Sequence, residues 1–279
     1  KNKFLYIAIV LCEGEVDSIG EIFIDDVPLT GSKYASKVQV DRKVGTDDQT
    51  ASSVLTPAPS WGSNDRLQGL AYIGLRLTFD KDVFTSIPNI TAIVNGRKVY
   101  DPRDGTTAFS SNPALCLRDY LTNTRFGKGL PTSLIDDTTF SSAANSCETQ
   151  NETYDGSGVD INRFDLNAII ETKNKVFENV KIMLGAMQGM MPYQDGTYKL
   201  IIDDDYDSPF DFTTDNIIGR FQITGVDKNS RYNKVVGKFI NPDLNWQGDS
   251  VIWPDAGSAE EAELLAEDAN IVLEKQFDI

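Results

Sequence analysis

Histidine is absent from the 279 residues of this chain. Its absence excludes Ser-His-Asp and Cys-His nucleophilic sites, zinc sites with histidine ligands, and pH switches based on imidazole. Basic residues are also scarce, because 26 lysines and arginines stand against 42 aspartates and glutamates, which leaves a net charge of −16. Binding of duplex DNA needs a basic surface, so this charge argues against a DNA-binding protein.

Cysteines and long apolar runs are few as well. Cys12, Cys116 and Cys147 are far apart and form no CxxC motif, so we expect free, buried thiols of the kind found in a reducing compartment. The longest apolar run, residues 4–12, is too short to span a bilayer, which takes about 20 residues. We therefore expect no membrane segment and no signal peptide. Because the first residue is Lys1 rather than Met, we expect a piece of a longer polypeptide.

What remains is a globular composition, with 40% hydrophobic and 24% charged residues. The length predicts about two domains that fold without a disulfide or a metal. The first hundred residues read as strands at 4–12, 19–27, 70–79 and 90–100, with a long and poorly regular loop at 41–69. Asn95-Gly96 lies inside the last run and predicts a hairpin that pairs residues 91–94 with 97–100.

Helix signals begin after this β-rich part. Asn112-Pro113 predicts the start of a helix over 112–124, and Asp136-Asp137 the start of a second one that reaches Cys147. Apolar spacing predicts a third helix over 172–188, and Ser258 with Glu261 forms a capping box for a helix near 258–268. A hairpin with an Asp195-Gly196 turn is expected within 193–202, and strands at 164–170, 219–226, 234–240 and 271–279.

These elements predict an α+β fold, rich in strands with a few inserted helices. We expect three parts: a β-rich portion at 1–105, a helix-containing region at 106–215, and strands at 216–279 that return to a β domain.

Two arrangements of acidic residues are candidate sites. Asp203, Asp205 and Asp207 have the spacing of calcium ligands, but Ser208 and Thr214 stand where an EF-hand loop has its glycine and its last glutamate, which favours a solvated turn. A glycosidase needs two carboxylates held a short distance apart. Glu13 and Glu15 flank Gly14 and supply such a pair, although the chain has many acids and pairs arise by chance.

Two other groups of residues each allow a functional and a structural interpretation. Basic residues gather at Arg97-Lys98 and at Arg125 and Lys128, but no glycine-rich phosphate loop accompanies them, so solvation or salt bridges are the favoured role. All methionines lie close together after residue 180, and they either fill an irregular core or form an adaptable interface for a partner helix; the core is the favoured reading. These residues are Met183, Met187, Met190 and Met191.

Several stretches resemble one family in serial order. Residues 11–16 read LCEGEV and are followed by the strand IGEIFID, residues 87–101 contain ITAIVNGRKVYD, and residues 112–129 carry NPALCLRDYLT and RFGKG. Residues 194–198 read QDGTY and residues 232–235 read YNKV. Together they are similar to the central tail-tip proteins of long-tailed bacteriophages, also called tail-hub or host-specificity proteins. Members of that family are much longer than this chain.

The resemblance implies a structural protein of the virion tail tip with tail-tube-like β-barrel domains. It implies a homotrimeric ring whose partners are the distal tail protein ring, the tape measure protein in the lumen, and tail fibre or tip proteins. The ring is expected to act as a gate for DNA, which meets the protein only in transit, past a negative lumen that repels phosphate.

It implies no catalytic residue, no cofactor and no metal. The alternatives are a tail-associated glycan or peptidoglycan hydrolase and a calcium-dependent carbohydrate-binding module.

Overall fold

The computed structural model describes most of the chain, namely residues 3–84, 86–152, 160–203, 212–219, 222, 224–225, 231–241, 244, 247–267 and 271–278. The chain divides into two compact units, Lys1–Ile202 and Asp203–Ile279. Strands predominate in both units and helices are inserted between them, which confirms the α+β, β-rich fold class. The expected division into three parts stays a prediction.

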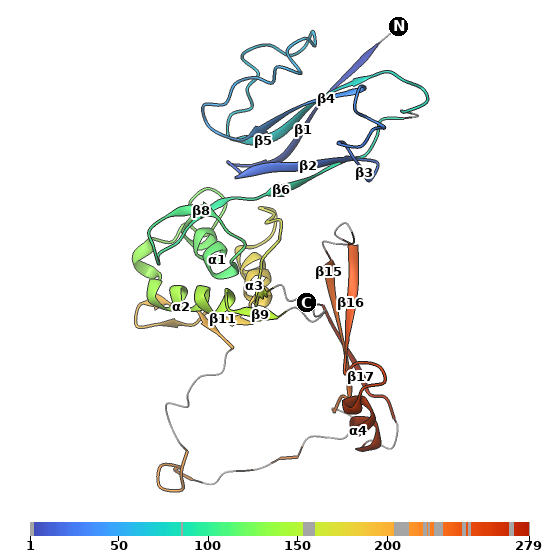
Figure 1. The fold of residues 1–279 in the computed structure, drawn as a ribbon. Helices are drawn as coiled ribbons and strands as arrows, with labels where there is room; N and C mark the ends of the chain where they lie inside the picture. The colour runs from blue at the N-terminus through green and yellow to red at the C-terminus, as the bar shows by residue number, and fades with distance from the viewer. Residues whose placement is uncertain are drawn as a thin grey trace. The chain divides into compact units, whose positions relative to one another are not determined.

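Two sheets enclose the core of the N-terminal part (Figure 1). One has the order β1 (Phe4–Glu13), β5 (Leu70–Thr78), β4 (Val38–Val44), and the other has the order β3 (Val27–Pro28), β2 (Ser18–Ile24), β6 (Ile90–Asn95). Alternate residues of the main strands point inward, so their apolar side chains meet between the sheets. The buried members of this core come from β5, from β2 and from the residues just before β2: Val16, Ile19, Ile22, Ala71, Ile73 and Leu75.

The loop between β4 and β5 is better ordered than the sequence predicted. It packs on the outer face of β5, where Leu55 and Tyr72 are 2% and 0% exposed and Ser52 is buried beside Gly74. Gln49 is also buried, and its side-chain amide donates hydrogen bonds to backbone carbonyls near the end of the loop. A long polar loop is thus held in place because its few apolar residues cover a sheet face.

The predicted hairpin at Asn95-Gly96 is wrong. β6 pairs with β2, and β7 (Lys98–Tyr100) pairs with β8 (Thr107–Phe109). Neither Asn95 nor Gly96 has the positive φ that such a two-residue turn requires. β6 packs against the sheet core while Val99 of β7 is buried in the next core along the chain, so the segment runs on instead of reversing.

Three helices form the second part of the first unit: α1 (Pro113–Thr122), α2 (Asp137–Cys147) and α3 (Val176–Ala186). The predicted caps are confirmed, since Asn112 Oδ1 accepts from the backbone of Ala114 and Asp136 Oδ1 from that of Thr138. The third helix is shorter than predicted: it begins after Lys175, which makes no side-chain capping hydrogen bond, and it ends before Met187, whose N–H donates to Gly185 O and Leu184 O. A 3₁₀ turn, η1 (Thr132–Leu134), links α1 to α2.

Residues 164–170 are not a strand, contrary to prediction. Their apolar side chains, including Phe164, Leu166 and Ile170, pack against the helical core, and Leu166 N donates to Ser111 O. The alternation that resembled a strand therefore reflects packing on helices, with no ladder formed.

Short strand pairs complete this part. They are β9 (Gln150–Glu152) with β10 (Asp160–Asn162), β11 (Gly189–Met190) with β14 (Ile201–Ile202), and β12 (Tyr193–Gln194) with β13 (Thr197–Tyr198). The Asp195-Gly196 hairpin is confirmed, with φ values of 55° and 86° at its two turn residues.

The second unit contains β15 (Lys234–Asn241), β16 (Gln247–Trp253), β17 (Glu274–Asp278) and α4 (Ala259–Glu267). The sheet order is β16-β15-β17, and β17 runs parallel to β15. The capping box is confirmed in part, since Glu261 N donates to Ser258 Oγ while the Glu261 carboxylate accepts from Gly257 N. Sequence analysis did not identify β16. The strand expected at 219–226 lies partly outside the described residues, and those described, 219, 222, 224 and 225, are not in a strand.

Candidate functional site

Two of the family-like motifs meet through ion pairs in the first unit. Arg125 Nε donates to Glu13 Oε1 at 2.7 Å, although 112 residues separate them in sequence. Lys98 Nζ lies 3.6 Å from Glu15 Oε1 and 4.0 Å from Asp17 Oδ1. The acid-rich turn after β1 therefore contacts both the start of β7 and the loop after α1.

Arg97 extends the same contact region to α1. Its Nε donates to Asp119 Oδ2 at 3.0 Å, and its guanidinium lies 5.1 Å from the centre of the Phe126 ring. Burial raises the pKa of Asp119, and the charge of Arg97 opposes that rise. We call this set of residues the motif junction: Glu13, Glu15, Asp17, Arg97, Lys98, Asp119, Arg125 and Phe126.

Glycines allow the backbone to approach closely around the motif junction. Gly14 adopts φ +94° and its N–H donates to Gly69 O at 2.7 Å. A Cβ at Gly45 would lie 2.4 Å from Gly14 O, and one at Gly127 would lie 1.8 Å from Tyr120 O. The glycines of the CEGE and RFGKG motifs are thus explained by backbone packing rather than by a phosphate site.

The predicted salt-bridge role of the basic residues is confirmed for Arg97, Lys98 and Arg125. The side chains of Arg125 and Glu13 are 76% and 50% exposed, so their pair contributes at most about 1 kcal/mol to stability. The motif junction therefore has a structural role: its ion pairs link the two sheets to α1. Of the two carboxylates that were candidates for a glycosidase, Glu13 accepts from Arg125 and Glu15 forms an ion pair with Lys98.

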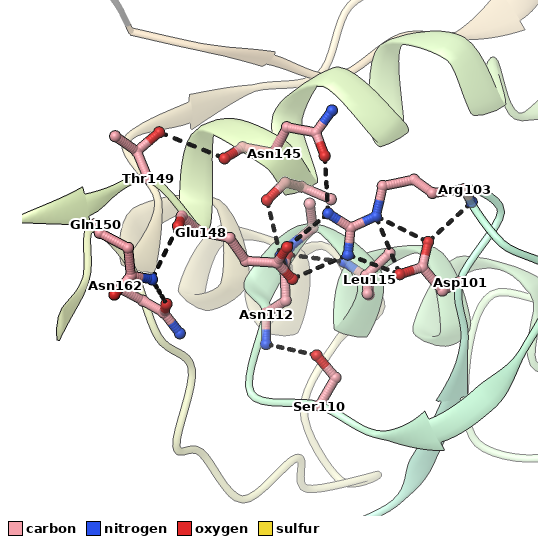
Figure 2. A network of polar contacts seen from close by, with 12 residues as sticks. Asp101, Arg103, Ser110, Asn112, Leu115, Asn145, Glu148, Thr149, Gln150 and Asn162 are labelled. Atoms are coloured by element: carbon pink, nitrogen blue, oxygen red, sulfur yellow. Dashed lines mark hydrogen bonds and ion pairs between the residues drawn. The ribbon is translucent and has the colours of Figure 1, made fainter. Parts of the chain in front are cut away.

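A second polar network joins the turn between β7 and β8 to α1 and α2 (Figure 2). Arg103 Nη2 lies 2.6 Å from Asp101 Oδ2, and Arg103 Nη1 lies 2.6 Å from Glu148 Oε2 and 2.8 Å from Asn145 Oδ1. Asn112 caps α1 with Oδ1 and uses Nδ2 to donate to Ala144 O and Glu148 Oε1. One arginine and one asparagine therefore connect three elements.

The network shifts the acidities of its carboxyl groups. Hydrogen bonds from Arg103 lower the pKa of Asp101 and of Glu148 below their ordinary values, and burial opposes the effect. Nearby, Arg118 is 6% exposed and makes two hydrogen bonds to Asp137. Sequence analysis missed Arg103, Arg118 and Glu148, because their partners come from different elements and no local spacing marks them.

Methionines mainly fill the core, as the favoured interpretation predicted. Met183 and Met187 are 3% and 0% exposed, and Met191 packs on the same core, while Met190 is 60% exposed. The cysteines are free; Cys147 is buried, and Cys12 and Cys116 are partly buried. Burial raises the pKa of Cys116 to about 12 and that of Cys147 to about 11, so both thiols are protonated at neutral pH.

Of the aspartates considered for calcium, Asp205 and Asp207 lie outside the described residues and Asp203 lies within them. In the described ranges, no group of three or more histidine, cysteine, aspartate or glutamate residues is arranged to hold a metal ion. The same ranges contain no helix that is long and apolar enough to cross a membrane.

No family model matches the chain. It is 26% identical over 242 residues to the baseplate hub protein pb3 of Escherichia phage T5, an alignment that covers 74% of this chain and 25% of the relative. It is 28% identical over 205 residues to the tip attachment protein J of Escherichia phage SECphi27, covering 66% of this chain and 16% of the relative. The aligned part is thus a quarter or less of each relative.

Among solved structures, the chain is similar to one in the virion of a native gene transfer agent particle. The TM-score is 0.51 at 12% identity, and the match covers 99% of this chain and 62% of the other. At this identity, the likeness shows a similar fold and nothing further. Taken together, the chain is similar to phage tail hub and tip proteins, the family that its motifs predicted. These two relatives confirm the resemblance and the localisation in the virion tail that it implies.

Proposed function

We propose that this chain is part of a structural tail-tip protein that forms a homotrimeric hub ring at the end of the tail tube. The ring connects to the distal tail protein ring, the tape measure protein and the fibre or tip proteins. It closes the tube and opens to let DNA pass during host attachment. The observation that carries the proposal is the sequence similarity to a baseplate hub protein and to a tip attachment protein.

The motif junction supports a mechanical role. Its ion pairs join the two-sheet part to β7, α1 and the loop after α1, so we expect the two parts of the first unit to transmit force as one body. The Arg103 network adds a second set of links between β7, α1 and α2. A ring that holds a closed tube against internal pressure needs such cross-linking between its structural parts.

The charge of the chain fits transit of DNA without binding. A net charge of −16 repels phosphate, so a lumen lined with part of this charge would let the duplex slide. We propose no catalytic role for the chain. Its acidic residues near the motifs are engaged with cations, as shown by the pairs of Glu13 and Glu15.

The test is the native mass of the purified chain, measured by mass photometry over a concentration series. We expect a species of three times the chain mass of 30.8 kDa. Adding the distal tail protein of the same phage is then expected to give a larger complex with a ring visible by electron microscopy. A strict monomer that fails to bind this protein at any concentration contradicts the proposal.

A turbidity assay on purified cell walls separates the hub from the hydrolase alternative. We expect no clearing by the chain, with lysozyme as the positive control. Clearing that is lost in a Glu13→Gln, Glu15→Gln double variant would favour the enzyme instead.

A further inference from the structure

Four consecutive residues of the second unit contact the segment that leads into β17, the last strand in the sheet order β16-β15-β17. We call these residues the strand-docking site: Arg231, Tyr232, Asn233 and Lys234. Arg231 Nη2 lies 3.6 Å from Glu267 Oε2 at the end of α4. The Nζ atom of Lys275 lies 5.5 Å from the centre of the Tyr232 ring. The site thus contacts the returning chain both before and within β17.

Asn233 makes the closest contacts of the strand-docking site. Its Nδ2 donates to Ile271 O at 2.8 Å, its Oδ1 accepts from Leu273 N at 2.8 Å, and its backbone N–H donates to Leu273 O at 3.0 Å. Asn233 is 4% exposed. One residue further on, Lys234 Nζ lies 2.9 Å from Glu274 Oε2. Asn233 therefore binds the backbone just before β17 as a neighbouring strand would, and this sets the register in which Lys234 pairs with Glu274.

The side chains around β17 contribute little burial. None of residues 271–276 is buried, and α4 contains no buried residue. β17 pairs with β15 over five residues in parallel, whereas β16 pairs with β15 over seven in antiparallel, and parallel pairing is slightly weaker per residue. The connection from β15 to β17 also contains β16 and α4, so its closure costs more entropy than the short connection from β15 to β16.

We propose that β17 leaves and rejoins the sheet as a separate unit while β15 and β16 stay paired, and that the strand-docking site sets how often it leaves. Segments with few buried apolar contacts and exposed backbone hydrogen bonds open locally at a low free energy, and β17 has both features. The sheet then alternates between three strands and two. This proposal does not depend on the proposed homotrimer.

Amide hydrogen exchange, followed residue by residue by NMR on the full chain, tests the separate opening of β17. Because β15 lies between β16 and β17, its alternate N–H groups face one neighbour or the other. We expect the groups that face β17 to exchange about tenfold faster or more than those that face β16. Equal rates for the two sets would mean that the sheet opens as one unit, which overturns the proposal.

Asn233→Ala tests the strand-docking site, because it removes both side-chain hydrogen bonds to the backbone before β17. We expect the exchange of β17 to rise by about tenfold, with no change in the β15 groups that face β16. Asn241→Ala is the matched control: Asn241 lies on the same strand, but its Nδ2 donates to Asp249 Oδ2 of β16 at 2.8 Å. The control should leave β17 unchanged. An Asn233→Ala chain with the parent's exchange rates overturns the proposal.

Glu274→Lys provides a second variant if Asn233→Ala does not fold, since Glu274 is exposed. It places two like charges where the ion pair with Lys234 stood, and we expect the exchange of β17 to rise by about threefold. The charge reversal, Lys234→Glu with Glu274→Lys, should restore the parent's rate. A rise that the reversal leaves in place would come from β17 itself rather than from the strand-docking site, and it would overturn the role proposed for that site.

Discussion

The helical part of the first unit and the sheet of the second unit use their apolar residues in different ways. Sixteen buried residues from α1, α2, α3 and the flanking strands form one cluster in the helical part. In the second unit, Val236 is the buried hydrophobic residue among those described, while Ile240, Val251 and Trp253 are 58%, 45% and 57% exposed. The helical part is therefore stabilised by a core of its own, and the second sheet mainly by its backbone ladder.

The largest effect is expected where a charge enters the helical core. Leu115 is 2% exposed, so Leu115→Asp places an unpaired carboxylate among apolar groups and should cost more than about 4 kcal/mol. Urea unfolding followed by circular dichroism measures this loss, and Leu121→Asp should behave alike. Ile182→Asp is the control, because Ile182 is 48% exposed. If Leu115→Asp melts like the parent, α1 does not contribute the core that distinguishes the two regions.

Two Gly→Ala substitutions in the helical part should change the free energy of unfolding in opposite directions. Gly127→Ala brings a Cβ 1.8 Å from Tyr120 O and should destabilise the chain by about 3 kcal/mol. Gly185→Ala lies in α3 with nothing within 4 Å of the new methyl group, so it should stabilise by about 0.5–1 kcal/mol. Differential scanning calorimetry of both variants checks the pair. Equal melting temperatures would show that the loop after α1 relaxes freely.

Removing the centre of the Arg103 network should have a smaller effect that depends on pH. Arg103→Met leaves Asp101 and Glu148 without their main donor and should cost about 2 kcal/mol at pH 7. Both carboxyl groups have a lowered pKa in the folded chain, so their contribution is present above their ordinary values of 3.8 and 4.5 and is lost as pH falls through the folded values.

The sign of this effect can be measured directly. The parent should lose stability between about pH 5 and pH 3 more steeply than Arg103→Met. Urea unfolding at a series of pH values provides the comparison, with Lys173→Met as a control for the loss of one exposed cation. Parallel pH profiles would mean that the network does not hold the turn between β7 and β8 to the helices.

The smallest expected changes in stability come from one substitution, Val→Thr, made both in the helical part of the first unit and in the sheet of the second unit. Val180→Thr buries a hydroxyl in the helical core, where Val180 is 4% exposed, and should cost about 1–2 kcal/mol. Val251→Thr makes the same change at a 45% exposed position of the second sheet and should stay within about 0.5 kcal/mol. Both are measured on the chain at concentrations where it is monomeric. A cost at Val251 equal to that at Val180 would show that the second sheet is covered in the monomer.

Local signals predicted the elements that depend on neighbouring residues. Asn112 before Pro113, Asp136 before α2, and Ser258 before α4 mark helix starts in the sequence and accept the capping hydrogen bonds in the structure. Asp195-Gly196 forms its turn because β12 and β13, the two strands on either side of it, pair with each other. The family resemblance likewise rests on short motifs in serial order and is matched by the curated relatives.

Local sequence patterns gave wrong predictions where residues far apart in the sequence compete as packing or pairing partners. Asn95-Gly96 has the composition of a turn, yet β6 gains more by pairing with β2 and burying Ile90, Ala92 and Val94. Residues 164–170 alternate like a strand but pack on helices. Propensity over a few residues is worth less than burial of a whole strand face, so tertiary packing overrides it.

By itself, the sequence determined the fold class, the helix caps, the hairpin at Asp195-Gly196 and the tail-protein resemblance, because each depends on composition or on residues a few positions apart. The tertiary structure alone decided that β6 joins β2, that Arg125 reaches Glu13, and that Arg103 binds Glu148. Those contacts join residues tens of positions apart, and they form only after the cores have placed the backbone.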